Sequence, residues 1–312
     1  MAHGTRAKNA LLSVLRENPA LTFIRFWATL RDVNRENRFV LRKAMELGVG
    51  VLDYRSLRTS VGKPDADTFF ILGSGASVED LAPSDFETIR SQVSVGINAW
   101  PLHHFVPDIY TYEPVPVDDG SHYKTMSMLN RPDIIEASPR ILFLKPRDDV
   151  EALQLRQIPA PLIDGTFLYG RFQPFTRSTK NLAYDLDIVL DRLERNNDPV
   201  LPDSGASIIR MACLGILMGF RHIVFVGVDL NNTDYFWERN PAHLLEAGIE
   251  KFDHGQKSET HETMSRMTRP FVVTEMVAAI NTRCSRKGIG LSVASEHSLL
   301  RQILPFYGFE NR

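Results

Sequence analysis

The sequence predicts an α/β protein with a Rossmann-like, mostly parallel sheet, and three observations carry that prediction. Short apolar runs bounded by turn residues recur along the chain, segments of helical periodicity lie between them, and a glycine turn follows the first run. Helices that alternate with strands act as crossovers, so the strands lie parallel in one sheet. The expected strands lie in residues 68–77, 94–98, 108–113, 140–145, 222–230 and 290–294, and the expected helices in residues 181–195, 204–220 and 270–287.

Composition sets the broad class of the molecule. The chain has 312 residues, of which 43% are hydrophobic and 24% are charged, and this is typical of a globular protein that can bury a core. Its formal net charge of −2 gives no global basic field, so we expect no nucleic-acid partner. The two cysteines, Cys213 and Cys284, lie in segments predicted to be helical and are expected to be buried thiols.

Neither a secretion signal nor a membrane span is expected. The opening segment, MAHGTRAKNALLSVLRENPAL, is too charged for a signal peptide. No apolar stretch approaches the roughly 18 residues that a membrane-spanning helix needs. We therefore expect a cytoplasmic protein, and peripheral contact with the inner membrane is left open.

Residues 1–64 are expected to form a helical N-terminal extension, and residues 65–312 the Rossmann-like domain. Apolar residues recur at helical spacing in the extension, and a polar linker with glycine and proline follows at 61–67. The extension is rich in arginine, so it is either a packed arm with a solvated face or a helix that binds an acceptor or a membrane surface. Residues 146–178 are expected to be irregular, and residues 231–268 a mobile loop that acts as a lid.

The glycine turn Gly73-Ser74-Gly75 follows the first expected strand and precedes a helix that Ser77 is expected to cap. Glycine lets the backbone approach a ligand closely, and the start of a helix offers free N–H donors. Asn98 stands at the end of the next strand, where a dinucleotide-binding fold has an acidic residue. Because the full glycine fingerprint is missing, the segment is either a purely structural turn or a nucleotide contact.

A second motif combines the start of a helix with the end of a strand. Ser204 and Gly205 open a long apolar helix, and the expected strand 222–230 then ends around Gly227 and Asp229. At the carboxyl end of a parallel strand, a glycine clears space and a carboxylate can accept hydrogen bonds from ligand hydroxyls. Asp229 either binds a ligand in this way or caps the turn that follows its strand.

Together these motifs resemble the bacterial lipooligosaccharide sialyltransferases of glycosyltransferase family 42 and the related flagellin-modifying nonulosonate transferases. The resemblance rests on GSGAS, on the strand that ends in Asn98, and on SGASIIRMACLGILMGFRHIVFVGVDL. The late segment SVASEHSLLRQIL adds to it, so the resemblance covers about residues 68–113 and 203–304. It implies a GT-A-variant, sialyltransferase-like fold.

The resemblance also implies a reaction. It is the metal-independent transfer of a sialic-acid-like nonulosonate, or of Kdo, from a CMP-sugar donor to a glycan or lipid-linked glycan acceptor. Such a transfer belongs to lipopolysaccharide or capsule biosynthesis and needs no cofactor besides the donor substrate. The family commonly forms oligomers, so a homo-oligomer is left open.

The residues that match the family motifs take their expected places from it. The nucleotide would lie against the glycine turn, the nonulosonate near the helix start, and the ribose and cytosine near the end of strand 222–230. An asparagine would contact the donor. The matching residues are Gly73, Ser74, Gly75, Asn98, Ser204, Gly205, Gly227 and Asp229.

Several positions depart from the family pattern, and Leu201-Pro202-Asp203 stands where the family has an arginine just before Ser-Gly. Glu113 stands where the family has a second asparagine, and a carboxylate there would repel the charges of the donor. Asn231 replaces the first of two tyrosines that hold the departing phosphate, and Tyr235 lies near the second. We therefore expect Tyr235 to stabilise the leaving phosphate, with Asn231 as a substitute hydrogen-bond donor.

The general base of the family is a histidine on the loop after the Gly-x-Asp strand. His261 is closest to that position, His254 is the alternative in the same loop, and His243 fits less well. A histidine titrates near pH 6.5, so it can take a proton from an acceptor hydroxyl at neutral pH.

Two rival functions stay open at this point. One is a hydroxymethylpterin pyrophosphokinase-like enzyme, which would use ATP and Mg²⁺, although the sequence lacks a Walker motif. The other is a non-catalytic module that binds a nucleotide sugar or a glycan.

Overall fold

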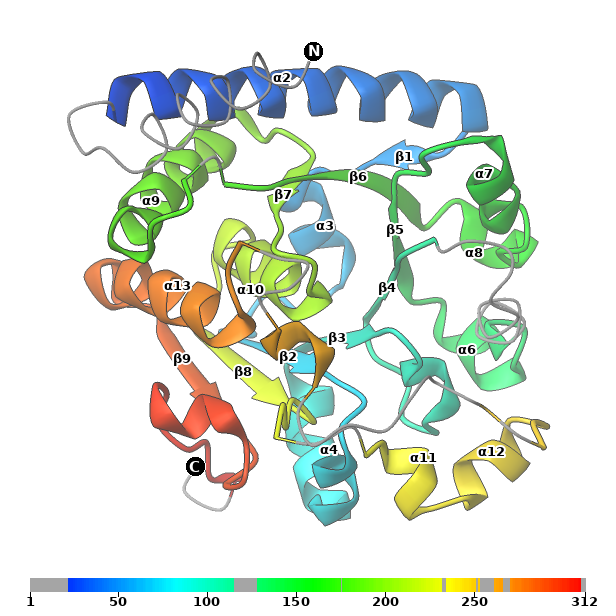
Figure 1. Cartoon of the computed structure of the whole chain (residues 1–312). Coiled ribbons are helices and arrows are strands. Elements are labelled where there is room, and N and C mark those ends of the chain that lie inside the picture. The colour runs from blue at the N-terminus through cyan, green and yellow to red at the C-terminus, as the bar shows by residue number, and fades with distance from the viewer. Residues whose placement is uncertain are drawn as a thin grey trace, which may run out of the picture.

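The computed structural model describes residues 22–114, 128–174, 176–231, 234–250, 252, 261–265 and 270–309. Within them, one nine-stranded sheet has the order β1-β6-β5-β4-β3-β2-β8-β9, and β7 also pairs with β6 (Figure 1). All strand pairs of the described residues are parallel, which confirms the predicted α/β fold. The strands are β1 (Gly50–Val51), β2 (Thr68–Leu72), β3 (Val93–Ile97), β4 (Ile109–Tyr112), β5 (Arg140–Leu144), β6 (Thr166–Phe172), β7 (Val200–Pro202), β8 (His222–Val226) and β9 (Gly290–Val293).

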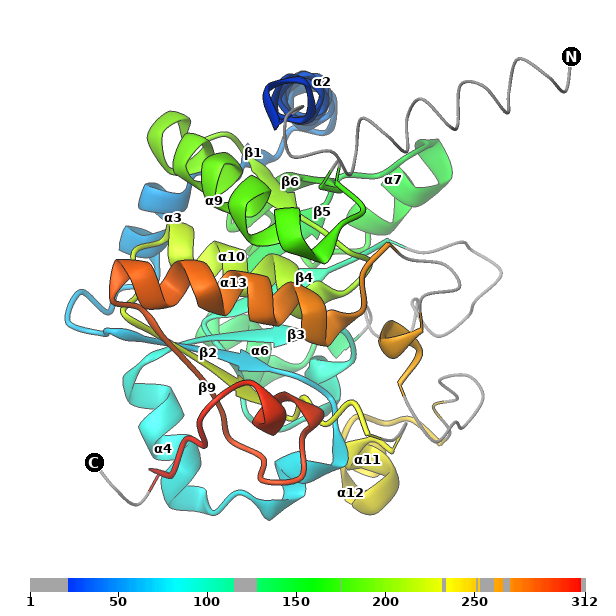
Figure 2. The same ribbon diagram turned by 60° about the vertical axis from the view of Figure 1, so that its left-hand side comes forward.

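Helices cover both faces of the sheet. Side chains of α9, α10 and α13 pack on one face, and side chains of α4, α6 and α8 pack on the other. Figure 2 shows α9, α10 and α13 on one side of the sheet and α4 on the other. The α-helices are α2 (Thr22–Leu47), α3 (Tyr54–Ser60), α4 (Pro83–Ser91), α6 (Pro132–Ala137), α7 (Asp149–Leu155), α8 (Ala160–Ile163), α9 (Thr179–Asn196), α10 (Ser207–Leu217), α11 (Phe236–Arg239), α12 (Ala242–Glu246) and α13 (Val273–Lys287). The short 3₁₀ helices are η2 (Ala76–Asp80), η3 (Trp100–Leu102), η4 (Glu262–Met264) and η5 (Leu299–Gln302).

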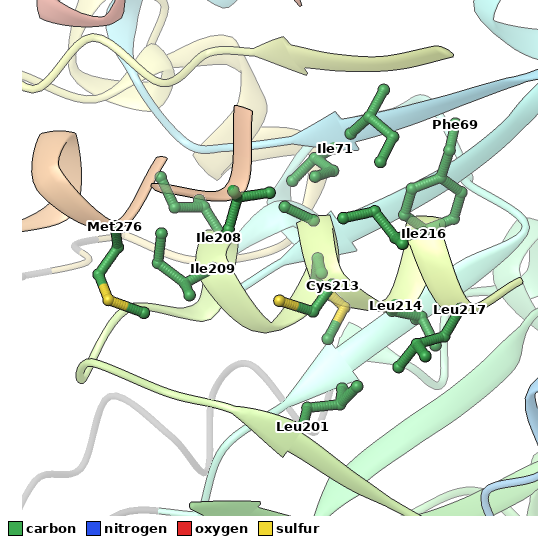
Figure 3. Close-up of a cluster of buried hydrophobic side chains, with 14 of the residues drawn as sticks. Phe69, Ile71, Leu201, Ile208, Ile209, Cys213, Leu214, Ile216, Leu217 and Met276 are labelled. Atoms are coloured by element: carbon green, nitrogen blue, oxygen red, sulfur yellow. The ribbon is translucent and has the colours of Figure 1, made fainter. Parts of the chain in front are cut away.

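The central strands are apolar throughout because both of their faces are buried. In β2, Phe69 and Ile71 belong to one core, while Phe70 and Leu72 belong to the other. Successive side chains of a strand point to opposite faces, so a strand that is covered twice shows no alternation. Helix α10 lies at the centre of the first core, and its Gly215 allows the close approach, since a Cβ there would lie 2.8 Å from the Phe69 ring (Figure 3).

The order of the strands creates a switch point between β2 and β8. From β2 the chain adds β3, β4, β5 and β6 on one side, whereas β8 and β9 lie on the other. In an open parallel sheet, the crevice at such a point, outside the carboxyl ends of the strands, is where ligands bind. The glycine turn after β2 and the Gly227–Asp229 segment after β8 both lie at this point.

The prediction that residues 146–178 are irregular is wrong. This segment contains α7, α8 and the seven-residue strand β6. Five of the seven β6 residues are buried, so the strand shows no regular alternation of apolar and polar residues. Prolines at 159, 161 and 174 flank it and make the segment resemble a loop in sequence.

The expected helical extension contains a strand as well as helices. Helices α2 and α3 agree with the prediction, but Gly50–Val51 forms β1, which pairs with the first half of β6. Strand β7 pairs with the second half of β6. The division of the chain between residues 64 and 65 stays a prediction. Among the described residues, no helix has both the length and the hydropathy that a membrane crossing requires.

The expected lid segment also holds more regular structure than its polar sequence indicates. Within 234–250 the chain forms α11 and α12, and Phe236 and Trp237 are buried at 0% and 2% exposure. Phe236 and Trp237 dock α11, and the buried His243 docks α12, although most of their neighbours are polar. Opening and closing of this segment stays a prediction.

Candidate functional site

The turns after β2 and β8 contact each other through their glycines. The Gly73 N–H donates to the Val226 carbonyl at 2.7 Å, and the Gly75 N–H donates to the Gly227 carbonyl at 2.8 Å. A Cβ on Gly73 would lie 2.5 Å from the Gly227 carbonyl oxygen, and a Cβ on Gly227 would lie 2.4 Å from that of Gly73. Both glycines are therefore required for this backbone contact, whether or not a ligand binds there.

Asp229 joins the two turns through its carboxylate, which is 7% exposed. It accepts a hydrogen bond from the Ser77 N–H at 3.1 Å and one from the Ser77 hydroxyl at 2.5 Å. The prediction that Ser77 caps an α-helix is wrong, because its hydroxyl donates to Asp229 and Gly75 occupies the N-cap position of a five-residue 3₁₀ helix.

The expectation of free N–H donors at the glycine turn is also wrong. Besides the donors already described, the Ala76 N–H donates to the Asp234 carbonyl at 3.2 Å. Tyr235 forms an antiparallel bridge with Gly75, and the Phe236 N–H donates to the Ser74 carbonyl at 3.1 Å. The segment before α11 therefore covers the turn. The Ser74 hydroxyl is buried and has no hydrogen-bond partner among the described residues, so it is a polar group of the turn that a ligand could still engage.

A buried charge cluster lies further along the same edge of the sheet. Arg210 of α10 is 0% exposed, donates from Nη1 to Asp203 at 2.7 Å, and forms an ion pair through Nη2 with Glu113. Arg171 of β6 donates to Glu113 at 2.6 Å and lies 3.4 Å from Asp203. Two arginines thus neutralise two carboxylates, so the charge of Glu113, which was expected to repel the donor, is compensated within the protein.

The pKa of Arg210 shows how strongly this cluster favours the charged guanidinium. Burial lowers the pKa, but Tyr169, Asp203 and Glu113 raise it by more, so it lies above its ordinary value. Sequence reasoning missed both arginines. Arg210 lies in an otherwise apolar helix, and Arg171 lies in the segment that was expected to be irregular.

The start of α10 lies beside the end of β3. The Ser207 hydroxyl donates to Asn98 Oδ1 at 3.3 Å, and Asn98 has a φ of +55°, in the left-handed region that asparagine tolerates. No side chain caps α10 at Ala206, so the first N–H groups of the helix receive no capping bond there. Ser204 is 1% exposed, and its hydroxyl has no partner among the described residues.

His261 and Asn231 lie close to the end of β8. The His261 N–H donates to the Leu230 carbonyl at 3.2 Å, and its Nδ1 lies 2.9 Å from the Thr263 hydroxyl. Asn231 Nδ2 donates to the His297 carbonyl at 3.0 Å, while its buried Oδ1 has no partner in the described part of the chain. Tyr235 is placed differently, on the glycine turn, where its ring stacks on Trp237 at 4.6 Å. His254 lies outside the described residues.

A cavity of about 350 Å³ opens at the carboxyl ends of β4, β5 and β6. Ion pairs line it: Lys145 lies 3.3 Å from Glu36 of α2, and Arg171 pairs with Glu113. The full lining is Glu36, Glu113, Pro114, Leu144, Lys145, Arg147, Glu151 and Arg171. Glu113 therefore borders the cavity. It also pairs with Arg210 of α10, and Ser207 of the same helix donates to Asn98.

Three histidines form the group of described residues that comes closest to a metal-ligand set. Ring nitrogens of His103, His104 and His243 lie within 4.8 Å of one another. However, His103 Nδ1 accepts a hydrogen bond from the Phe105 N–H at 3.0 Å, and the His103 ring stacks on the two others at 4.3 and 4.8 Å. Lone pairs of stacked rings lie in nearly parallel planes and do not converge on one point. The group instead connects α12 to η2, because His243 Nε2 lies 2.8 Å from Glu79 Oε1. His243 is therefore engaged away from the other candidate residues.

The buried His103 predicts a loss of stability in acid. Burial, with smaller contributions from His104, His243 and Arg131, lowers the pKa of His103 to about 2. The unfolded chain protonates His103 near pH 6.5, whereas the folded protein does not. The part of the free energy of unfolding that depends on neutral His103 is therefore complete above pH 6.5 and falls as the pH decreases. Between pH 7 and pH 5 the loss is about 2 kcal/mol. The His103→Asn variant lacks this titrating group, so its free energy of unfolding, measured in urea, is expected to fall less between pH 7 and pH 5. An unchanged pH dependence would contradict the prediction.

No protein-family model and no curated protein matches the chain. The chain is similar to the solved structure of the sialyltransferase CstII from Campylobacter jejuni in complex with the substrate analogue CMP-3FNeuAc, with a TM-score of 0.41 and 13% identity, over 78% of this chain and 86% of that chain. It is also similar to the MAf glycosyltransferase from Magnetospirillum magneticum AMB-1, with a TM-score of 0.39 and 14% identity, over 83% of this chain and 39% of that chain. At these identities and TM-scores, the two similarities assign neither a family nor an activity to the chain.

Proposed function

We propose that the protein is a glycosyltransferase that moves a sialic-acid-like nonulosonate, or Kdo, from a CMP-sugar donor to a glycan or lipid-linked glycan of lipopolysaccharide or capsule. The observation that carries the proposal is the switch point of the sheet. There, the segments that hold Ser74 and Asp229 are in direct contact, and the neighbouring strand β3 leads to Asn98. The reaction would take place in the cytoplasm and without a metal ion.

The polar groups at this edge fit the parts of such a donor. The Asp229 carboxylate accepts two hydrogen bonds from Ser77 and has further lone pairs that can accept bonds from ribose hydroxyls. The buried Ser74 hydroxyl would bond the nucleotide. The start of α10, with the Ser204 hydroxyl beside it, would receive the carboxylate of the nonulosonate, because a helix N-terminus favours an anion.

The chemistry requires one base and a stabilised leaving group. His261 would take the proton of the acceptor hydroxyl, whose oxygen then bonds to the anomeric carbon as the bond from that carbon to the phosphate oxygen breaks. The Thr263 hydroxyl lies 2.9 Å from His261 Nδ1 and the Thr263 N–H donates to the same nitrogen at 3.3 Å, and these two contacts would orient the ring. CMP leaves with a single phosphate group, which carries less negative charge than a diphosphate. Hydrogen bonds from the Tyr235 hydroxyl and the Asn231 amide would therefore stabilise it without a divalent ion.

Ligand-induced thermal stabilisation of the full chain tests the proposal. CMP is expected to stabilise the protein by about 2.7 kcal/mol at a hundred times its Kd. UMP, UDP and ATP with Mg²⁺ are expected to have little effect. Asp229→Asn removes a charged acceptor and is expected to weaken CMP binding about 10- to 100-fold.

The matched control is Asp65→Asn, an exposed residue before β2 at the opposite edge of the sheet. It is expected to bind CMP like the unaltered protein. Stabilisation by ATP with Mg²⁺ and none by CMP would overturn the proposal in favour of a pyrophosphokinase-like enzyme. Stabilisation by CMP without any turnover of CMP-activated nonulosonates would overturn the enzymatic part and leave a binding module.

A further inference from the structure

Helix α2 is the outermost element of the molecule along one whole side. It packs against β6 and α9. Figure 1 shows its long axis along the periphery of the molecule, and Figure 2 shows the same helix nearly end-on at that periphery. With 26 residues and a rise of about 1.5 Å per residue, it is about 39 Å long. Val33, Val40 and Ala44 are buried on its inner side. The opposite side, which we call the α2 outer face, carries exposed side chains from Ile24 to Met45 among the described ones.

Large apolar side chains are concentrated on the α2 outer face. Ile24, Trp27, Leu41 and Met45 are 44%, 56%, 44% and 85% exposed. They are four of the nine exposed large hydrophobic residues found in the described part of the chain, and no other helix there carries more than two. Such a concentration on one element marks an interaction surface rather than scattered exposure.

Four arginines lie between these apolar residues. Arg31 and Arg35 are 80% and 76% exposed, and Arg38 and Arg42 are also exposed. Asp32 lies 3.9 Å from Arg31 and 3.5 Å from Arg35 and offsets one charge. The outer face is therefore positive on a chain whose formal net charge is −2.

The apolar residues and the arginines share a single side of the helix. With 3.6 residues per turn, all eight positions fall within an arc of about 120°, opposite the buried side. A straight helix presents such an arc to a flat surface along its whole length. Arginine and tryptophan side chains both suit the interface of a bilayer, where the charge meets phosphate and the apolar part meets acyl chains.

We propose that the α2 outer face binds the protein to an anionic lipid bilayer. The four arginines, less the one charge that Asp32 offsets, complement a negative membrane surface, and the interleaved apolar side chains would be buried at the headgroup boundary. A second copy of the chain is a poorer partner, because a two-fold contact through this face would set arginines against arginines. The inference is independent of the glycosyltransferase proposal.

Vesicle sedimentation of the full chain tests the inference directly. The protein is expected to sediment with vesicles of 30% phosphatidylglycerol and 70% phosphatidylcholine at 50 mM NaCl, and to be released at 500 mM NaCl or on pure phosphatidylcholine. Arg38→Gln with Arg42→Gln is expected to lower the partition coefficient about 25-fold, since each basic residue near the surface contributes about fivefold. The control, Arg55→Gln with Arg156→Gln, removes the same charge from exposed positions outside α2 and should bind like the unaltered protein.

Tryptophan fluorescence gives a second readout that locates the contact. The chain has three tryptophans, and Trp100 and Trp237 are buried at 0% and 2% exposure, so Trp27 is the one that a bilayer can reach. Anionic vesicles are expected to shift its emission to the blue, and Trp27→Phe should abolish the shift. Equal binding by the two double variants, or no binding to anionic vesicles, would overturn the inference. Self-association that the Arg38→Gln and Arg42→Gln pair abolishes would assign the face to a second copy instead.

Discussion

Replacing Arg210 with alanine is expected to lower the free energy of unfolding by about 3–5 kcal/mol. The guanidinium is 0% exposed and holds the carboxylates of Asp203 and Glu113, whose side chains are 2% and 32% exposed. Removal of one partner leaves the Asp203 charge buried without its main counter-ion, and the penalty for an unpaired buried charge exceeds the Coulombic gain of the original pair. The substitution would also release the Ser207 hydroxyl, which Arg210 contacts at 2.9 Å.

Urea unfolding at pH 7 measures this effect. Arg239→Ala is the matched control, because its partner Asp80 and Arg239 itself are 51% and 52% exposed, and an exposed ion pair contributes at most about 1 kcal/mol. A loss of less than 1 kcal/mol for Arg210→Ala would show that the cluster does not stabilise the fold. CMP binding by the folded fraction would show whether the substitution displaces α10 in protein that is still folded or only lowers the amount of folded protein.

Replacing His261 with alanine is expected to reduce the rate of sugar transfer about 10²- to 10⁴-fold, which is the usual contribution of a general base. Binding of CMP should change little, because the histidine would act on the acceptor hydroxyl and not on the nucleotide. Thr263→Val should give a smaller decrease and a shifted pH profile, since the Thr263 hydroxyl lies 2.9 Å from His261 Nδ1 and would orient the ring.

Release of CMP from CMP-activated nonulosonates, with and without an acceptor glycan, measures this prediction. His297→Ala is a suitable control, because His297 is exposed on a neighbouring loop and its backbone carbonyl, which Asn231 contacts, is unaffected. Near-normal transfer by His261→Ala would remove this residue as the base. If His254→Ala lost transfer at the same time, the role would belong to His254.

The sequence predicts β2, β3, β4, β5, β8 and β9 but misses β1, β6 and β7 at one edge of the sheet, for a physical reason. Strands β2 and β8 are covered on both faces, so TFFIL and HIVFV are continuous apolar runs with clear boundaries. Strand β6 contains Gly170 and Arg171 and is flanked by prolines, so tertiary contacts and not its own pattern make it a strand. Ser77 is not the helix cap that the sequence predicts, because its hydroxyl donates to Asp229, which lies 152 positions further along the chain.

The candidate site likewise contains residues that the sequence could place together and residues that it could not. Gly73, Gly227 and Asp229 could be placed together because the carboxyl ends of parallel strands share one edge. The pairing of Glu113 with Arg171 and Arg210 spans 58 and 97 positions, and no local pattern predicts it. Arginine in an apolar helix would usually be expected at its surface, and only the fold shows that Arg210 is buried between two carboxylates.

The division of the outer edge of β6 between two strands has a consequence for solubility. β1 has two residues and β7 has three, and together they pair with the edge of β6 that faces away from β5. A long, flat terminal strand would present a row of unpaired N–H and C=O groups on which strands of another molecule could assemble. Here that row is broken into two short pieces, so this border of the sheet offers little template for aggregation.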